Sequence, residues 1–513
     1  MEFALRPYAT AAIALAGASL IAVNPVALPA LDIQVRAVQL AAGDDIGLVI
    51  GGSGTPIPGT AYVDAANALY IHSHFPDTIY PGVLANGLFT PEGLYPLTGV
   101  KTLPFNYPSD PTSTPIAGFP SQSTSVGQGV TILDNNIQAN IADHNTTTVF
   151  GYSQSATISS LEMQQLAADH VPTSDVNFVL IGDPSAPNGG LLERFNGFEN
   201  SAGAHALPLN LPSLGLSFDG ATPDEPYQTA IYSMEYDGFA DFPRYPLNLL
   251  ADLNAFLGIQ TLHGTYLNGG VNGSGPTATD IANAKLLPGS EHAETDACVS
   301  CTTDYYMIDT LGGQQITPPL VSLLGGIPLI GKPVEELFGP ALTYLINLGY
   351  GDGAQGWSDT AANVATPFGL FPDVTLGQFF QGLFAALGEG FHNLITAAPV
   401  QALSLFDGAS DAAAAAGQAS ATAFTSLSDF VNALSGAASS LYSALLPTAD
   451  IVNALVSSVP QYDISLIFDN LFSGHLIDAI GLPIAANMAL FTLAAGFELE
   501  VITDAIKGAI SAF

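Results

Sequence analysis

Hydrophobic and polar positions in the first part of the chain follow two alternating patterns. Short β-rich runs, the pattern of buried strands, occur at residues 46–50, 146–150, 176–181 and 229–236. Segments in which apolar residues recur every three or four positions, the pattern of amphipathic helices, occur at residues 124–143 and 156–168. Strands that alternate with helices predict an α/β fold with a mostly parallel central sheet and helices on both faces.

This pattern changes near residue 371, where we place a boundary between an α/β domain (43–371) and a C-terminal helical region (372–513). In the helical region Ala, Leu and Ser dominate, and glycine-rich turns separate the segments. Residues 482–497 are nearly all apolar, but a proline, an asparagine and a threonine interrupt them. We therefore predict a buried or interfacial helix there, in preference to a membrane span.

Residues 1–42 are predicted to hold a signal peptide or signal anchor followed by a short linker. Residues from Ala9 to Val23 are all small or apolar, and Arg6 precedes them. These 15 residues suit a signal peptide better than a membrane span, which needs about 20. The nearest match to a cleavage site falls inside this stretch, so an uncleaved anchor is one alternative. A buried N-terminal helix is another. A cleaved signal peptide or an uncleaved anchor predicts a secreted or cell-envelope protein.

The charge balance excludes some classes of partner. Eight Lys and Arg residues stand against 45 Asp and Glu, which gives a formal net charge of −37. A nucleic-acid binder needs a basic face, and this chain cannot form one. Apolar residues make up 48% of the chain and charged residues only 10%, whereas about 25% is usual for charged residues. This composition favours a globular protein that works in or beside lipid, or that is exported.

The two cysteines, Cys298 and Cys301, form a C-x-x-C pair in a loop-like segment. A zinc site needs four ligands, and neither a second cysteine pair nor a nearby histidine pair completes one. A thioredoxin-like pair would lie at the start of a helix. We predict a small disulfide loop in an oxidising compartment, and no metal.

The segment from Val149 to Ala156 carries the most informative motif. A predicted strand runs into Gly-Tyr-Ser-Gln-Ser at 151–155, and a predicted helix follows. This is the G-x-S-x-G nucleophile elbow, with Ser155 in place of the last glycine. The tight turn needs small residues two positions on either side of the nucleophile, and this segment provides them. Ser153 is therefore the candidate nucleophile; a serine-rich helix start that caps itself is the alternative.

A serine nucleophile needs a histidine base, and in α/β-hydrolases the histidine follows the acid in the chain. His263 lies after the last predicted strand in a loop-like setting, and it is the candidate base. His205 precedes the acid strand and breaks this order, while His292 lies in a polar insertion with no strand before it.

The acid that orients the histidine is predicted to follow the strand 229–236. We favour Asp241, because it lies three residues after a glycine and just before Pro243, a common arrangement in hydrolases. Asp237, directly at the strand end, is the alternative acid. The aspartate that does not orient the histidine should accept backbone amides in the turn. Asp183 lies one strand earlier and is predicted to be structural.

Two sets of donors are candidates for binding a developing oxyanion. The backbone N–H of Gln154, directly after the nucleophile, is the first. The second donor should come from the loop after an early strand, where an amide or hydroxyl of Ser53, Gly54 or Thr55 is available. A plain glycine turn is the alternative for this loop.

Four segments together resemble the PE-PPE domain of mycobacterial proteins. They are Gly-Tyr-Ser-Gln-Ser at 151–155, Tyr-Asp-Gly-Phe-Ala-Asp-Phe-Pro at 236–243, Leu-His-Gly-Thr-Tyr at 262–266 and Leu-Gly-Tyr-Gly-Asp at 348–352. The resemblance covers about residues 45–371 and implies an α/β-hydrolase fold close to the cutinases. It points to Ser153 as nucleophile, His263 as base and an aspartate between 236 and 243 as acid.

The resemblance implies a serine esterase or lipase that acts on acyl esters of lipids through an acyl-enzyme and needs no cofactor. A relative that transfers acyl chains onto cell-envelope glycolipids, such as trehalose lipids, is the first alternative. A non-catalytic lipid-binding envelope protein is the second. The apolar leader replaces the helical module that precedes this domain in PE and PPE proteins, so their secretion route and partner pairing are not implied.

Overall fold

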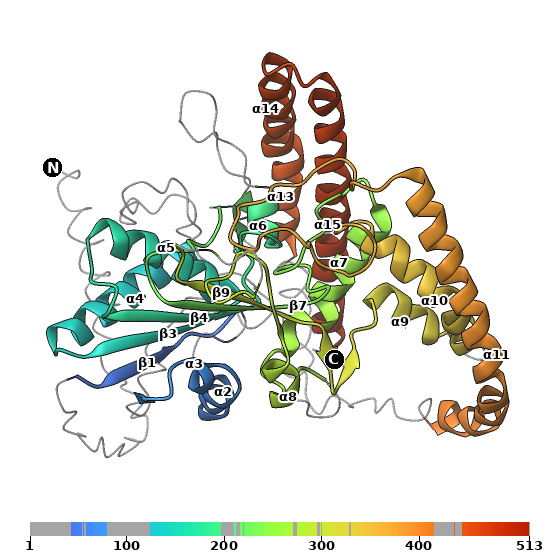
Figure 1. The fold of residues 1–513 in the computed structure, drawn as a ribbon, viewed down its shortest axis with the longest axis horizontal. Helices are drawn as coiled ribbons and strands as arrows, with labels where there is room; N and C mark the ends of the chain where they lie inside the picture. Colours follow the sequence, from blue (N-terminus) through green and yellow to red (C-terminus); the bar gives the residue numbers. More distant parts are fainter. Residues whose placement is uncertain are drawn as a thin grey trace, which may run out of the picture. The chain divides into compact units, whose positions relative to one another are not determined.

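The fold is taken from a computed structural model (Figure 1). The structure describes residues 43–53, 55, 58–79, 124–195, 210–211, 216–218, 220–269, 274–294, 298, 300–327, 330–414, 436 and 444–511. The predicted leader and linker at 1–42, the rival histidine His205 and the oxyanion candidate Gly54 lie outside the described residues.

A seven-stranded, mostly parallel sheet forms the centre of the α/β part, in the order β2-β1-β3-β4-β7-β9-β8. Only the β8–β9 pair is antiparallel. The strands are β1 (Asp45–Val49), β2 (Thr78–Ile79), β3 (Thr146–Tyr152), β4 (Val176–Ile181), β7 (Thr229–Met234), β8 (Lys285–Leu286) and β9 (Thr303–Ile308). Two small antiparallel pairs lie apart from it: β5 (Asn210–Leu211) with β6 (Leu216–Ser217), and β10 (Thr310–Leu311) with β11 (Gln314–Gln315). All four predicted strands are confirmed, as is the predicted fold class.

Helices cover both faces of this sheet (Figure 1). They are α2 (Thr60–Ala66), η1 (Asn67–Ile71), α3 (His72–His74), α4 (Thr124–Ala142), α5 (Gln154–Ala168), α6 (Leu191–Arg194), α7 (Leu249–Thr261), η6 (His263–Thr265), α8 (Ala278–Ala282), α9 (Pro319–Gly325) and α10 (Gly331–Asn347). The predicted helix 124–143 corresponds to α4, whose apolar positions 126, 130, 133 and 137 are buried. The predicted helix 156–168 corresponds to α5.

The parallel register brings the carboxyl ends of the central strands to one edge of the sheet. Tyr152 at the end of β3 lies opposite Ile181 at the end of β4, which in turn lies opposite Tyr232 in β7. Residues that directly follow these strands therefore meet at this edge. Ligand and catalytic sites of open parallel sheets form at this end of the strands.

Long helices form the C-terminal part: α11 (Leu376–Ala414), α13 (Leu445–Asn453), η9 (Ala454–Ser458), α14 (Val459–Phe472) and α15 (Leu476–Ser511). α11 packs on α10, α14 runs beside α15, and α15 also packs on α7 (Figure 1). The apolar segment 482–497 lies within α15, where Ala485, Ala486 and Ala489 are fully buried while Ile484 and Phe491 are exposed. The domain boundary near 371 stays a prediction.

Two stretches in the described part of the chain, Pro447–Phe472 and Leu476–Gly508, are long and apolar enough to cross a membrane. Only 22% and 39% of their most apolar windows are buried in the molecule. Buried core helices of soluble proteins meet the same length and composition criteria, so these two stretches are weak support for a membrane anchor.

Candidate active site

The turn between β3 and α5 presents Ser153 at the carboxyl end of the sheet. β3 ends at Tyr152 and α5 begins at Gln154, so one residue makes the whole turn. Ser153 has φ 58° and ψ −120°, a left-handed conformation that non-glycine residues rarely adopt. A Cβ at Gly151 would lie 2.7 Å from the Ser155 carbonyl oxygen, which explains the need for glycine there. The strain of this turn falls on Ser153, the residue whose hydroxyl the turn presents.

The Ser155 side chain is small enough for the turn and also forms hydrogen bonds to the backbone. Its Oγ accepts a hydrogen bond from the Tyr152 N–H (2.7 Å). The same hydroxyl lies 3.1 Å from the carbonyl oxygen of Ile50, to which it can donate. Because Ile50 directly follows β1, this fully buried serine links the elbow to the loop after the neighbouring strand. A glycine at this position would leave both backbone groups without these bonds.

Ser153, His263 and Asp237 form one chain of hydrogen bonds. The Ser153 hydroxyl lies 2.7 Å from Nε2 of His263. Nδ1 of the same ring lies 2.8 Å from Oδ2 and 3.0 Å from Oδ1 of Asp237. With Nδ1–H donating to the carboxylate, Nε2 is left as the acceptor for the serine proton. The three side chains come from the ends of β3 and β7 and from η6, the turn after α7, so the predicted nucleophile and base are brought together.

The structure places the alternative acid, Asp237, and not the favoured Asp241, against His263. Asp241 is buried beside the site, but Oδ2 of its carboxyl accepts the N–H of Tyr236 (3.0 Å) instead of contacting His263. Tyr236 has φ 66°, and this left-handed residue turns the chain directly after β7. The turn directs Asp237 towards the histidine and folds Asp241 back onto the end of the strand. Burial raises the pKa of Asp241 well above its usual range, whereas an acid that orients a catalytic histidine must be ionised.

The carboxylate of Asp237 is fully buried and held by two further donors. The Tyr266 hydroxyl donates to Oδ2 (2.8 Å), and the Phe239 N–H donates to Oδ1 (3.1 Å). Tyr266 is itself fixed, because its oxygen accepts the N–H of Met234 (2.7 Å). Sequence analysis missed the role of Tyr266. Its place three residues after His263, on the same turn, is the signal that could have identified it.

Aromatic rings and one glycine enclose the imidazole of His263. The Phe239 ring centroid lies 4.7 Å from the imidazole centroid, and the Tyr152 ring lies 5.5 Å away. The Tyr152 hydroxyl also bonds the His263 carbonyl oxygen. A Cβ at Gly182 would lie 3.2 Å from Cε1 of His263, so any larger residue after β4 would crowd the imidazole. The neighbouring Asp183 accepts hydrogen bonds from Thr222 and the Ser185 N–H, which agrees with its predicted structural role.

The predicted oxyanion loop lies against the nucleophile. A Cβ at Gly52 would be 3.3 Å from Cβ of Ser153, so the loop after β1 is in contact with the elbow. The Thr55 N–H closes this turn by donating to the Gly52 carbonyl oxygen (3.0 Å), which removes that amide from the candidate donors. Ser53 stays a candidate on the exposed side of the turn. Gln154 is the first residue of α5, directly after Ser153, as the elbow motif requires.

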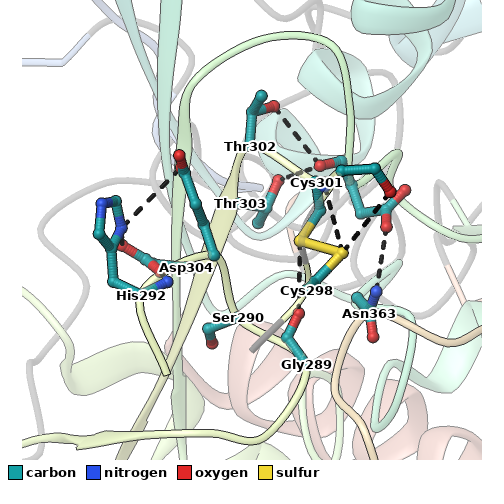
Figure 2. Close-up of a disulfide and its surroundings, with 12 residues drawn as sticks. Gly289, Ser290, His292, Cys298, Cys301, Thr302, Thr303, Asp304 and Asn363 are labelled. Carbon is teal, nitrogen blue, oxygen red and sulfur yellow. Dashed lines mark hydrogen bonds and ion pairs between the residues drawn. A yellow bond between two sulfur atoms is a disulfide. The ribbon is translucent and has the colours of Figure 1, made fainter. Parts of the chain in front are cut away.

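The cysteine pair lies in a separate loop before β9. Cys298 and Cys301 are joined as a disulfide, and the Cys301 N–H donates to Sγ of Cys298 (Figure 2). In the described part of the chain, Asp224 and these two sulfur atoms are the one group close enough to share a metal ion. Because the disulfide takes up both sulfurs, only the carboxylate is left as a ligand. Nδ1 of His292 lies 2.9 Å from Asp304 near this loop, in an exposed position (Figure 2).

Comparison with known proteins places these residues in a family. The sequence model of the PE-PPE domain matches residues 81–351, more than half of the chain. Over 491 residues the chain is 39% identical to the uncharacterized PPE family protein PPE28 of Mycobacterium tuberculosis, covering 91% of this chain and 67% of that protein.

Two further relatives from the same organism match a shorter part. Esterase PE16 is 36% identical over 65% of this chain and 53% of its own length, and PE family protein PE3 is 36% identical over 64% of this chain and 58% of its own length. The chain thus spans little more than half of these two relatives. The matched range contains Ser153, Asp237 and His263. This chain belongs to the PE-PPE domain family.

Proposed function

We propose that the protein is a serine esterase that hydrolyses acyl esters of lipids. The observation that carries the proposal is the continuous set of hydrogen bonds from Ser153 through His263 to Asp237, in the geometry that a serine hydrolase needs before substrate binds. The family membership and one relative named an esterase support the same class of reaction. The apolar composition and the exposed apolar helices favour a lipid ester over a water-soluble one.

In the proposed mechanism the Ser153 oxygen attacks the ester carbonyl carbon as its proton passes to Nε2 of His263. The tetrahedral oxyanion is bound by the Gln154 N–H together with a donor from the loop after β1. The C–O bond to the leaving alcohol then breaks as His263 returns the proton to that alcohol. Water, activated by the same nitrogen, attacks the acyl-enzyme and releases the acid. Asp237 keeps the imidazole in the correct tautomer and stabilises its charged form.

A fluorophosphonate probe tests the proposal most directly. We expect covalent labelling of the full chain at Ser153, release of the acid from p-nitrophenyl esters, and loss of both in Ser153→Ala. Triad losses reduce kcat by about 10⁴-fold to 10⁶-fold. A Ser174→Ala variant, which removes an exposed hydroxyl far along the sequence from the elbow, is the matched control. Absence of labelling in folded protein would instead support a non-catalytic lipid-binding role.

The acceptor of the acyl group is decided by product analysis. Hydrolysis predicts the free acid as product whether or not a sugar is present. If adding trehalose or a glycolipid converts the product into a sugar ester, the protein is an acyltransferase that uses the same serine. For its location, we propose an exported protein of the cell envelope, on the basis of the apolar segment at 9–23 and the disulfide.

A further inference from the structure

The two elements that carry the catalytic acid and base pack directly on each other. Helix α7 ends two residues before His263, and Asp237 lies in the turn after β7. A Cβ at Gly258 of α7 would overlap the carbonyl oxygen of Tyr236, so the helix and the turn are in backbone contact. Anything that fixes α7 and this turn together therefore fixes the geometry between the acid and the base.

Helix α15, from the C-terminal part of the chain, lies beside α7 (Figure 1). A Cβ at Gly496 of α15 would overlap the Phe256 ring of α7, so the two helices are in close contact there. One turn further on, Glu500 accepts a hydrogen bond from the side-chain amide of Gln260 (2.8 Å). Phe497 is 6% exposed and meets Phe256 edge to face, with 6.1 Å between the ring centroids. Phe497 is thus held in place by the pair of helices.

The ring of Phe497 also supports Phe239, which touches both the acid and the base. The Phe239 N–H donates to Oδ1 of Asp237 (3.1 Å), and its ring centroid lies 4.7 Å from that of the His263 imidazole. Phe497 stacks on the same ring, with centroids 6.3 Å apart and planes inclined by 20°. The Phe239 side chain is partly exposed, whereas Phe497 is buried. Because buried side chains are close-packed, Phe497 limits how far the Phe239 ring can rotate away from the imidazole.

We propose that Phe497 is a positioning residue of the catalytic site and acts on His263 through the ring of Phe239. The inference rests on the proposed esterase function and goes beyond it, because it makes α15 part of the catalytic apparatus. His263 must take a proton from Ser153 and pass it to the leaving alcohol, so its ring must point accurately at both. A misplacement of about 1 Å can reduce the rate by about 10²-fold. The C-terminal helices therefore contribute to catalysis.

Phe497→Ala in the full chain tests the proposal, with p-nitrophenyl butyrate as the substrate. We expect kcat to fall by about tenfold and KM to stay within twofold, because the histidine is misplaced while the substrate still binds. The rate of fluorophosphonate labelling at Ser153 should fall by the same factor as kcat. Ile451→Ala, in α13 of the same apolar core, also shortens a large buried side chain and is the matched control. A loss of kcat as large in Ile451→Ala overturns the inference, since core packing alone would then explain the effect.

A double-mutant cycle shows whether the effect passes through Phe239. Phe239→Ala alone should lower kcat by about as much as Phe497→Ala, because each change removes the support of the imidazole. Adding Phe497→Ala to Phe239→Ala should then change kcat by less than twofold, since residues that act through one contact are not additive. If Phe497→Ala lowers kcat by the same factor in both backgrounds, Phe497 does not act through Phe239 and the inference is wrong.

Thermal unfolding establishes that each variant is folded at the assay temperature. Phe497→Leu keeps most of the apolar volume but removes the flat ring, and it takes the place of Phe497→Ala if that variant does not fold. We expect at least a threefold loss of kcat at constant KM, and a folded Phe497→Leu variant with unchanged kcat overturns the inference. The unmodified protein separates the two proposals. If it neither hydrolyses the ester nor labels at Ser153, the esterase function fails and this inference with it; if it does both and the Phe497 variants keep their kcat, only the positioning role fails.

Discussion

At the scale of single residues, the two aspartates after β7 differ in what their oxygens contact. Asp237 touches His263, whereas Asp241 accepts a backbone amide of the turn. We therefore predict that Asp237→Asn lowers kcat by about 10⁴-fold, because the histidine loses its correct tautomer. Asp241→Asn should lower the thermal stability and leave kcat within tenfold. Steady-state kinetics on both variants checks this, and a reversed order would restore Asp241 as the acid.

Tyr266 is a positioning residue at the same scale. Its hydroxyl contributes one of the bonds that fix the carboxylate of Asp237, and hydrogen bonds to charged groups contribute about 1.5–3 kcal/mol. Tyr266→Phe keeps the ring in the core and removes that bond, together with the bond that the same oxygen accepts from the Met234 N–H. We expect kcat to fall by about tenfold to a hundredfold, at 1.36 kcal/mol per factor of ten, with KM nearly constant. A variant whose KM rises while kcat is unchanged would show that Tyr266 shapes the substrate site instead.

The choice between Asp237 and Asp241 could not be made from the sequence. Both lie within one turn after a predicted strand, and which of them reaches the histidine depends on the conformation of Tyr236. A positive φ at a tyrosine has no sequence signal, because such residues usually avoid that region. That Ser153 and His263 come together was predictable for the opposite reason. Each stands in a motif whose residue types the local geometry demands.

At the scale of elements, local pattern decides what is predictable. The strands β1, β3, β4 and β7 consist mostly of apolar or β-branched residues, as expected for strands buried on both faces. The strand β9 (Thr303–Ile308) was missed, because its Thr-Asp-Tyr-Tyr start is polar and it follows the cysteine loop. Only its second half is apolar, and all six of its residues pair with β7.

The elbow itself provides a test at this scale. Ser155 holds the end of β3 and the loop after β1 through its hydroxyl. Ser155→Gly restores the usual elbow sequence, yet it takes the hydrogen-bond acceptor away from the Tyr152 N–H and leaves the Ile50 carbonyl oxygen with only the longer bond from the Tyr62 hydroxyl (3.4 Å). We predict a loss of about 1–3 kcal/mol in the free energy of unfolding, measured by urea denaturation. Ser174→Gly, in an exposed turn, is the control. Unchanged or increased stability would mean that only the size of residue 155 matters.

At the scale of the whole molecule, several of the acidic residues have carboxyl groups that are buried in the folded chain. Burial raises the pKa of Glu162 to about 9, of Glu235 to about 7 and of Asp183 to about 6. Neither oxygen of Glu162 has a hydrogen-bond partner among the residues that the structure describes, and the same holds for Asp252, whose pKa burial also raises well above its usual range. The net charge of −37 gave no sign of these groups, because composition does not separate exposed acids from buried ones.

These groups make the stability depend on pH in a defined direction. In the unfolded chain they lose their protons near pH 4 to 4.5, whereas the folded chain keeps them up to about pH 6, 7 and 9. The folded state therefore binds more protons over this window, so the free energy of unfolding falls as pH rises. His74, whose pKa burial lowers, acts in the opposite direction, but it is a single group.

We predict a melting temperature that is higher at pH 5 than at pH 8, measured by differential scanning calorimetry at constant ionic strength. Glu162→Gln removes one of these shifts while keeping the shape of the side chain, so it should flatten the profile mainly at its alkaline end. Glu294→Gln, an exposed substitution that changes the net charge equally, controls for general repulsion and should leave the slope intact. A melting temperature that rises from pH 5 to pH 8 in the unmodified protein would show that these carboxyls ionise freely in the folded state. Glu162 would then need partners outside the residues that the structure describes, because an unpartnered carboxylate in the core is far too costly to persist.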